Sequence, residues 1–167
     1  MNENKSSFVN KANIINILLI LLIFLLDRFS KIKAINYILN SNSSIYVNDY
    51  LNLDLVWNTG IGFGLFNLDA GILYHLISLI IFFVIIALIF FIIKSTLKID
   101  KFLYSMILGG ALGNFYDRAL YFAVPDFIDI HFNDYHWFTF NIADIFISFG
   151  IILFILKEII FAKNEKS

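Results

Sequence analysis

The chain has 167 residues, of which 60% are hydrophobic, and its mean hydropathy is +0.82. Soluble domains carry about 45–50% apolar residues, so this composition excludes an ordinary soluble protein, and the length predicts one domain. The formal net charge of -1 points neither to nucleic-acid binding nor to an acidic tail, and the absence of cysteine excludes disulfides, thiolate metal sites and a cysteine nucleophile.

Four apolar stretches are long enough to cross a membrane, which takes a helix of about 20 residues. They cover residues 13–33, 70–93, 102–121 and 142–162, and the third becomes polar in its second half. The first stretch has no small-x-small cleavage site, and its unbroken apolar core, residues 17–26, is followed directly by Asp27 and Arg28. We therefore expect a retained helix rather than a cleaved signal peptide. Four spans place both termini on the same side of the membrane.

Basic residues predict which side that is. Eight of the twelve Lys and Arg residues lie in the N-terminus, in the connection between the second and third spans, or in the C-terminus. Nine of the thirteen acidic residues lie toward the opposite side. By the positive-inside rule, both termini should be cytoplasmic.

Two segments then face the outer side. In residues 34–69, a polar turn at 40–44 is followed by leucines and aromatic residues that alternate with polar ones, a pattern that predicts one or two short strands. Residues 123–140 form the other segment, a loop rich in Asp, His and aromatic residues. The expected fold is an all-α membrane protein of four transmembrane helices, with a small β-containing segment outside the membrane.

Polar side chains collect at one depth, near the outer ends of the predicted spans. A charge inside the bilayer costs at least about 2.5–3.5 kcal/mol, so such residues are functional candidates. The candidates are Asp27, Lys31, Asn114, Asp117, Arg118, Asp126, Asp129, Asn141 and Asp144.

Residue spacing indicates how this polar layer is held together. Asp27 and Lys31 are four residues apart, so they share a helix face and can form an ion pair. A G-x-x-x-G pattern at residues 109–113 favours close approach of a neighbouring helix.

Carboxylates are the most abundant candidates for chemistry. Ser30 and Lys31 are adjacent and point apart on a helix, so they cannot form a Ser-Lys dyad with each other, and no G-x-S-x-G pattern is present. Two close carboxylates can share one proton and hydrolyse an amide, one acting as general base and the other as general acid. Spacing alone does not choose the pair among Asp117, Asp126, Asp129 and Asp144.

Histidines are the remaining candidates for a metal site. His131 and His136 flank Asp134, but no H-E-x-x-H pattern exists and loop histidines usually face water. We therefore expect no metal and no cofactor.

Two other functions fit the same polar layer. A small transporter or proton-coupled channel would use it as an ion path, but the cytoplasmic halves of the predicted spans are nearly pure Ile, Leu and Phe. A scaffold subunit would use it to hold helices together.

Five blocks of the sequence, in order, resemble those of the bacterial lipoprotein signal peptidases, or type II signal peptidases. The family patterns are D-x-x-x-K, N-x-G-x-x-F-G, G-G-A-x-G-N-x-x-D-R, V-x-D-F-I-D and F-N-x-A-D. The matching segments are DRFSK at 27–31, NTGIGFG at 58–64, GGALGNFYDR at 109–118, VPDFID at 124–129 and FNIAD at 140–144. The chain departs from the family at Ile61 and Gly62, where two small residues are usual, and at Pro125.

The resemblance implies an aspartic endopeptidase of the bacterial inner, or cytoplasmic, membrane. It would remove the signal peptide from diacylglyceryl-modified prolipoproteins, cutting before the lipidated cysteine, near the extracytoplasmic face. It also implies a small β-cradle beside the membrane, contact with membrane lipid and sensitivity to globomycin. We further expect a monomer.

The resemblance also assigns roles to residues. Asp126 and Asp144 would be the catalytic dyad. The residues that bind substrate or support the dyad would be Asn58, Gly60, Asn114, Arg118, Asn141, Asp27, Lys31, Asp117 and Asp129.

Overall fold

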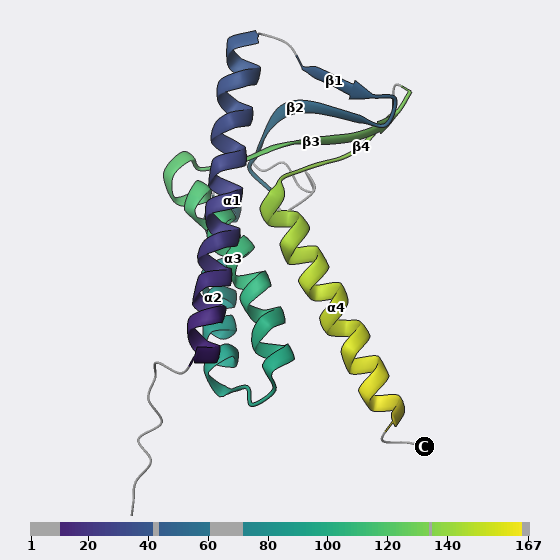
Figure 1. Cartoon of the computed structure of the whole chain (residues 1–167). Coiled ribbons are helices and arrows are strands. Elements are labelled where there is room, and N and C mark those ends of the chain that lie inside the picture. The colour runs from purple at the N-terminus through teal and green to yellow at the C-terminus, as the bar shows by residue number, and fades with distance from the viewer. Residues whose placement is uncertain (1–10, 42–43, 61–71, 134, 165–167) are drawn as a thin grey trace, which may run out of the picture.

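The structure, a computed structural model, describes residues 11–41, 44–60, 72–133 and 135–164. Its elements, in chain order, are α1 (Lys11–Ser41), β1 (Ile45–Asn48), β2 (Leu51–Asn58), α2 (Ile72–Lys94), α3 (Lys98–Tyr121), β3 (Val124–Phe132), β4 (Tyr135–Phe140) and α4 (Ile142–Asn164). The strands form one antiparallel sheet in the order β1-β2-β3-β4. The sheet lies at one end of the helices, and the described ends of α1 and α4 point to the other end (Figure 1).

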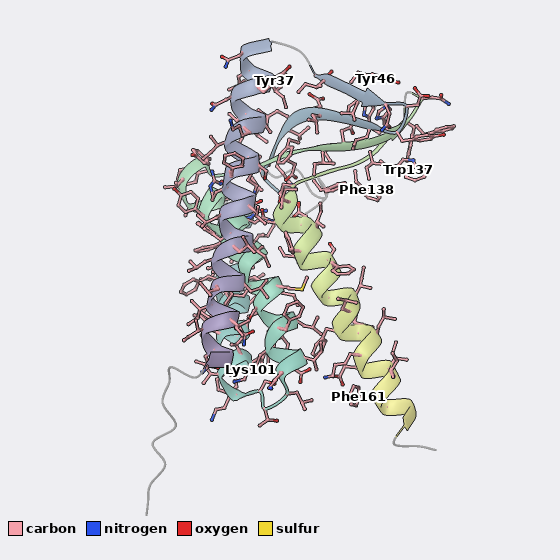
Figure 2. All side chains as sticks on the ribbon, viewed as in Figure 1. Tyr37, Tyr46, Lys101, Trp137, Phe138 and Phe161 are labelled. Carbon is pink, nitrogen blue, oxygen red and sulfur yellow. The ribbon has the colours of Figure 1, made fainter. Side chains whose placement is uncertain are left out.

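The helices are apolar on the outside and partly polar inside. Side chains project outward along α1, α2 and α4 (Figure 2), and most of the large exposed ones are Leu, Ile and Phe. Asp27, Lys31 and Asp117, in contrast, have no exposed surface. Within the described residues, three segments are long and apolar enough to cross a membrane: Asn13–Asn40, Tyr74–Lys94 and Ile142–Ala162. Helix α3 falls short of that standard because its second half carries Asn114, Asp117 and Arg118.

Helix α3 packs closely against its neighbours because glycines face them. A Cβ atom on Gly109 would lie 2.9 Å from Ile23 Cβ of α1, and one on Gly110 would lie 2.6 Å from the Ala143 carbonyl oxygen of α4. A Cβ atom on Gly113 would overlap the Asp27 carboxylate. The close helix approach predicted from the G-x-x-x-G pattern is confirmed.

Helix α1 continues beyond Lys33, where the apolar stretch ends, to Ser41. Its last turns remain helical because they have an apolar surface to bury: Ala34 and Ile38 pack against Phe127 of β3. Leu53 and Leu55 of β2 complete this small core. The extension therefore fixes the sheet directly above the helices.

The sheet is larger than the sequence suggested. Residues 123–140, expected to be a loop, form the hairpin β3–β4, and Asn133 takes a left-handed conformation at its turn. The expected four helices and β-containing segment are present, but the label all-α does not describe a protein with four helices and a four-stranded sheet. No period-two pattern marked β3 because its residues 124–127 are all buried, so both faces of the strand are covered.

A bulge in β2 directs one polar side chain toward the helices. The pairing of β2 with β3 shifts between Leu53 and Val56. Leu53 and Leu55 pack into the small core beside α1. Asn58, beyond the shift, is also buried, with 2% of its surface exposed, and its side chain bonds Asp126. Bulges commonly redirect a side chain beside an active site in this way.

Candidate active site

Asn141 organises the first turn of α4. Its side-chain Oδ1 accepts a hydrogen bond from the Asp144 backbone N–H at 3.1 Å, and its own backbone N–H donates to Asp144 Oδ2 at 3.2 Å. This reciprocal pair is a capping box, which satisfies two amide donors that a helix start leaves free. The same bonds fix the Asp144 carboxylate at the end of α4 next to the sheet.

Asn141 also reaches a second carboxylate. Its Nδ2 donates to Asp126 Oδ1 at 2.5 Å, and Asn58 Nδ2 donates to Asp126 Oδ2 at 2.9 Å. Both donors are neutral amides. Burial, and secondarily the negative charge of Asp144, raises the pKa of Asp126 from 3.8 to about 7, although the two amide bonds act in the opposite direction.

Asn114 connects Asp144 to a buried cation. Its Nδ2 donates to Asp144 Oδ1 at 2.8 Å, while its Oδ1 accepts from Lys31 Nζ at 2.8 Å. The lysine fixes the orientation of the Asn114 amide, so that the N–H side faces the carboxylate. Lys31 therefore acts on Asp144 through Asn114.

Lys31 belongs to a separate cluster of charges between α1 and α3. Its Nζ lies 2.8 Å from Asp27 Oδ2 and 2.8 Å from Asp117 Oδ2. Arg28 pairs with the other oxygen of Asp117, and Asp27 Oδ1 accepts a 3.0 Å hydrogen bond from the Ala143 backbone N–H. Two carboxylates thus face two cations, and the bond to Ala143 attaches the start of α4 to α1.

Arg118 connects α3 to the end of β2. Its guanidinium donates to the Gly60 carbonyl oxygen, and the Gly60 N–H donates to Asn58 Oδ1 at 2.9 Å. Tyr74 of α2 donates its hydroxyl to the Arg118 backbone carbonyl at 2.8 Å. Within the described residues, Arg118 Nε and Nη1 have no hydrogen-bond partner although both are buried.

A cavity of about 410 Å³ opens beside these residues. Its polar end is formed by Asn58, Asn114, Arg118, Asp126 and Asp144. Its remaining walls are mainly apolar and come from α2, α3 and α4: Ile81, Val84, Ile107, Ala111, Ile147 and Ile151. Two carboxylates thus meet at the mouth of an apolar groove between helices.

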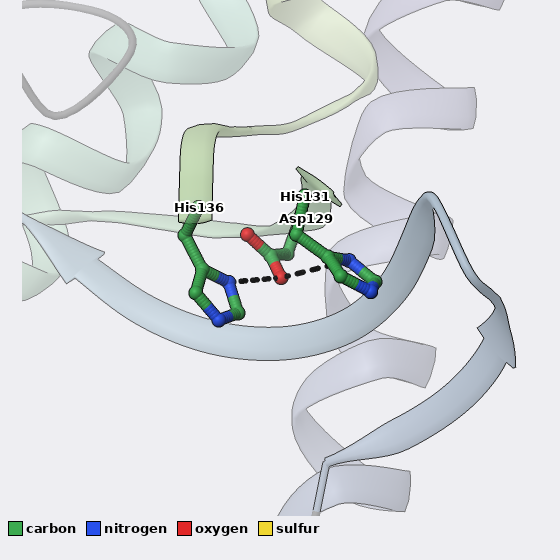
Figure 3. Close-up of side chains that lie close together, drawn as sticks. All are labelled: Asp129, His131 and His136. Atoms are coloured by element: carbon green, nitrogen blue, oxygen red, sulfur yellow. Dashed lines mark hydrogen bonds and ion pairs between the residues drawn. The ribbon is translucent and has the colours of Figure 1, made fainter. Parts of the chain in front are cut away.

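The structure separates the residues expected from the sequence into three groups. Asp126 and Asp144 line the cavity with Asn58, Asn114 and Arg118, while Asn141 and Gly60 contact these residues through hydrogen bonds. Asp27, Lys31 and Asp117 form the charge cluster. Asp129 contacts the imidazoles of His136 and His131 on the sheet instead of the cavity residues (Figure 3). Ile61 and Gly62 lie outside the described residues.

Two residues that hold the site together were not predicted from the sequence. Arg28 was noted only as following the apolar run, yet a charge next to Asp27 at a helix end was a usable signal that it belongs to the buried cluster. Tyr74 carries no such signal, because tyrosine is common near membrane interfaces whether or not it bonds a backbone carbonyl.

Known proteins share both this sequence and this architecture. The pattern of the family described as "Signal peptidase (SPase) II" matches residues 19–160. The lipoprotein signal peptidase of Pelagibacter ubique is 44% identical over 144 residues, covering 86% of each chain. That of Thermodesulfovibrio yellowstonii is 41% identical over 135 residues, covering 81% of this chain and 88% of its own.

A solved structure has a similar fold. A bacterial membrane enzyme determined by the in meso method at 2.3 Å resolution superposes with a TM-score of 0.73 at 30% identity, over 89% of this chain and 90% of that one. The sequence relatives and this structural likeness each cover more than four fifths of the chain. The chain therefore belongs to the signal peptidase II family, the membrane aspartic peptidases that remove signal peptides from prolipoproteins.

Proposed function

We propose that Asp126 and Asp144 are the catalytic dyad of this lipoprotein signal peptidase, and that the scissile bond lies just before the diacylglyceryl-modified cysteine of the substrate. One observation carries the proposal. The two carboxylates meet at the polar end of the cavity, and Asn141 donates to both, through its side chain to Asp126 and through its backbone to Asp144.

The electrostatics of the pair support a shared proton. The donors to Asp126 are the amides of Asn58 and Asn141, which place no full positive charge on it. Two buried carboxylates in this setting resist double ionisation, so near neutral pH the pair holds one proton. The ionised member takes a proton from the attacking water, and the protonated member donates to the carbonyl oxygen of the scissile amide.

Arg118 supplies donors for the substrate. Its Nε and Nη1 groups are buried, without partners among the described residues, at the same end of the cavity. Buried guanidinium N–H groups without partners are costly, and a peptide carbonyl or an ester oxygen of the lipid would satisfy them. Arg118 thus positions the backbone or the lipid head next to the dyad.

The apolar walls of the cavity suit the lipidated substrate. Ile81 and Val84 of α2, together with Ile147 and Ile151 of α4, offer only hydrocarbon below the dyad. Acyl chains and the apolar part of a signal peptide gain about 25 cal/mol for each Å² of apolar surface removed from water. The same groove is where globomycin would bind.

We also propose the membrane arrangement. Helix α3 also crosses the membrane, as the third of four spans in chain order. Its charged residues Asp117 and Arg118 are buried, and α1, α2 and α4 around it carry apolar side chains on their outward faces. The sheet then lies on the extracytoplasmic side, with the dyad near that surface and both termini in the cytoplasm. The basic Lys94 at the end of α2 and Lys98 and Lys101 at the start of α3 fit a cytoplasmic connection between these helices.

The test uses isosteric variants. Purified protein in detergent is incubated with a diacylglyceryl prolipoprotein, beside Asp126→Asn, Asp144→Asn and, as a matched control, Asp54→Asn on the exposed side of β2. Each dyad variant should lose about 10²–10⁴-fold in kcat, because each removes a general acid or base, while Asp54→Asn should retain its rate.

The melting temperature decides whether a loss of rate reflects chemistry or folding. All three variants should unfold near the temperature of the parent. A dyad variant that is folded and cleaves at the parental rate would contradict the assignment.

A further inference from the structure

The β3–β4 hairpin holds a second group of ligand-type side chains, away from the cavity. We propose that Asp129, His131 and His136 form a binding site for one divalent transition-metal ion, with zinc as the natural occupant. No H-E-x-x-H pattern announces it, because that pattern describes two histidines on a helix, whereas these two face each other across strands.

Strand pairing brings the three side chains together. His131 of β3 is the direct cross-strand partner of His136 of β4, and Asp129 precedes His131 by two residues, so it lies on the same face of the sheet. One ligand atom from each lies within 4.8 Å of the others. The imidazole rings stack with centroids 5.4 Å apart, and the Asp129 carboxylate lies between them (Figure 3).

The spacing of the ligand atoms suits a tetrahedral ion. Asp129 Oδ2 is 2.7 Å from His136 Nδ1 and 3.6 Å from His131 Nδ1. Zinc binds nitrogen and oxygen at about 2.0–2.2 Å, which places the ligand atoms of a tetrahedral site about 3.3–3.5 Å apart. Small side-chain rotations therefore convert the observed arrangement into a coordinated one.

Unsatisfied polar atoms indicate that the group lacks a partner. His131 is 8% exposed, and its Nδ1 is buried, directed toward Asp129, and without a hydrogen bond among the described residues. Asn52, the cross-strand partner of Asp129 on β2, has a buried Oδ1 that likewise lacks a partner there. Two buried polar atoms without partners beside one carboxylate are unusual in a protein interior, and a cation bound by the oxygen and the unprotonated ring nitrogen would satisfy both.

The ligand set selects the class of metal. Two imidazole nitrogens and one carboxylate oxygen favour first-row ions such as Zn²⁺, whereas Ca²⁺ and Mg²⁺ prefer sites built from oxygen alone. The His136 side chain is 57% exposed, which leaves a route for the ion and a coordination position for water.

The proposed ion would stabilise the hairpin rather than take part in hydrolysis. Asp129 is three residues from Asp126, about 10 Å along an extended strand, so the ion lies beyond reach of the dyad. Coordination would join β3, which carries Asp126, to β4, which leads into Asn141 and the start of α4. A bound ion should therefore stabilise the frame that sets the spacing of the two carboxylates.

The test measures binding without substrate. Protein purified with an affinity tag free of histidine is stripped with EDTA, desalted in detergent and titrated with Zn²⁺ by calorimetry, and with Co²⁺ as an absorbing probe of the ligands. The chain has three histidines, so His75→Ala on α2 is the matched control for His136→Ala. Asp129→Asn tests the role of the carboxylate. The His136→Ala variant should fold, because the His136 side chain is exposed.

We expect one Zn²⁺ per chain and an increase in melting temperature on binding. Affinity should fall at least about tenfold in His136→Ala and Asp129→Asn, and should stay unchanged in His75→Ala and in Asp126→Asn. No saturable Zn²⁺ binding to the parent, or equal affinity in His136→Ala, would overturn the proposal. Retained binding in the inactive Asp126→Asn would separate this site from the catalytic one.

Discussion

Two pairs of buried aspartates lie within the same outer layer of the molecule, and they are held in opposite ways. Asp27 and Asp117 face the cations Lys31 and Arg28, so two negative charges meet two positive ones. The donors to Asp126 and Asp144 are instead amides, from Asn58, Asn114, Asn141 and the α4 backbone.

This difference suits the two pairs of aspartates to different roles. Carboxylates paired with cations join helices, which suits a structural role. Carboxylates held by neutral amides in a shared cavity can exchange a proton, which acid–base catalysis requires. Asn114 connects the two clusters, because it accepts from Lys31 and donates to Asp144.

The largest effect on stability should come from removing a cation of the first pair. Lys31→Met leaves Asp27 and Asp117 with one positive partner fewer in a buried site, which typically costs about 3–5 kcal/mol. Thermal unfolding in detergent measures the loss, with the exposed Lys33→Met as the control. If Lys31→Met unfolds at the parental temperature, Asp27 and Asp117 do not have the structural role assigned to them.

A smaller loss should follow from separating α1 and α3. In Gly113→Ala the new methyl group overlaps the Asp27 carboxylate, and overpacking of this kind typically costs about 1–3 kcal/mol. Leu120→Ala on the exposed surface of α3 is the control. Since the Asp27–Lys31 contact must shift as well, kcat should fall along with the melting temperature, and an unchanged melting temperature would argue against the close helix contact.

The smallest effect is expected at the opposite end of the helices. Lys157→Gln removes the 2.6 Å ion pair with Asp100, which joins α4 to the start of α3 far from the cavity, and a second 2.6 Å pair with Glu158. Ion pairs near a surface contribute about 0–1 kcal/mol each, so the loss of stability should be small and the cleavage rate should not change. A marked loss of activity would show that the far ends of α3 and α4 influence the dyad.

Much of this arrangement could be predicted from the sequence. Long apolar stretches marked the helices, and the depth of Asp27, Asn114, Asp117 and Asp144 predicted one polar layer, since a charge in the bilayer needs a partner. The choice of Asp126 and Asp144 came from family resemblance. The reason for that choice lies in hydrogen-bond partners such as Asn58, which the bulge in β2 directs toward the site and which spacing alone could not reveal.

The sheet was harder to predict for a physical reason. β3 is buried on both faces near Asp126, so it lacks the alternation that marks a half-exposed strand. The partners of Asp129 were equally hidden, because the register that pairs His131 with His136 is set by the hairpin and not by sequence distance.

The dependence of kcat on pH tests the shared proton most directly. The pKa of Asp126 is raised to about 7, so its proton is present below that pH and is lost as the pH rises through it. The rate should therefore decline on the alkaline side with a midpoint near pH 7, and on the acidic side it should decline once both carboxyls are protonated, giving a bell-shaped profile. A rate that stays constant from acidic to clearly alkaline pH, with protein that remains folded throughout, would contradict an amide-held dyad sharing one proton.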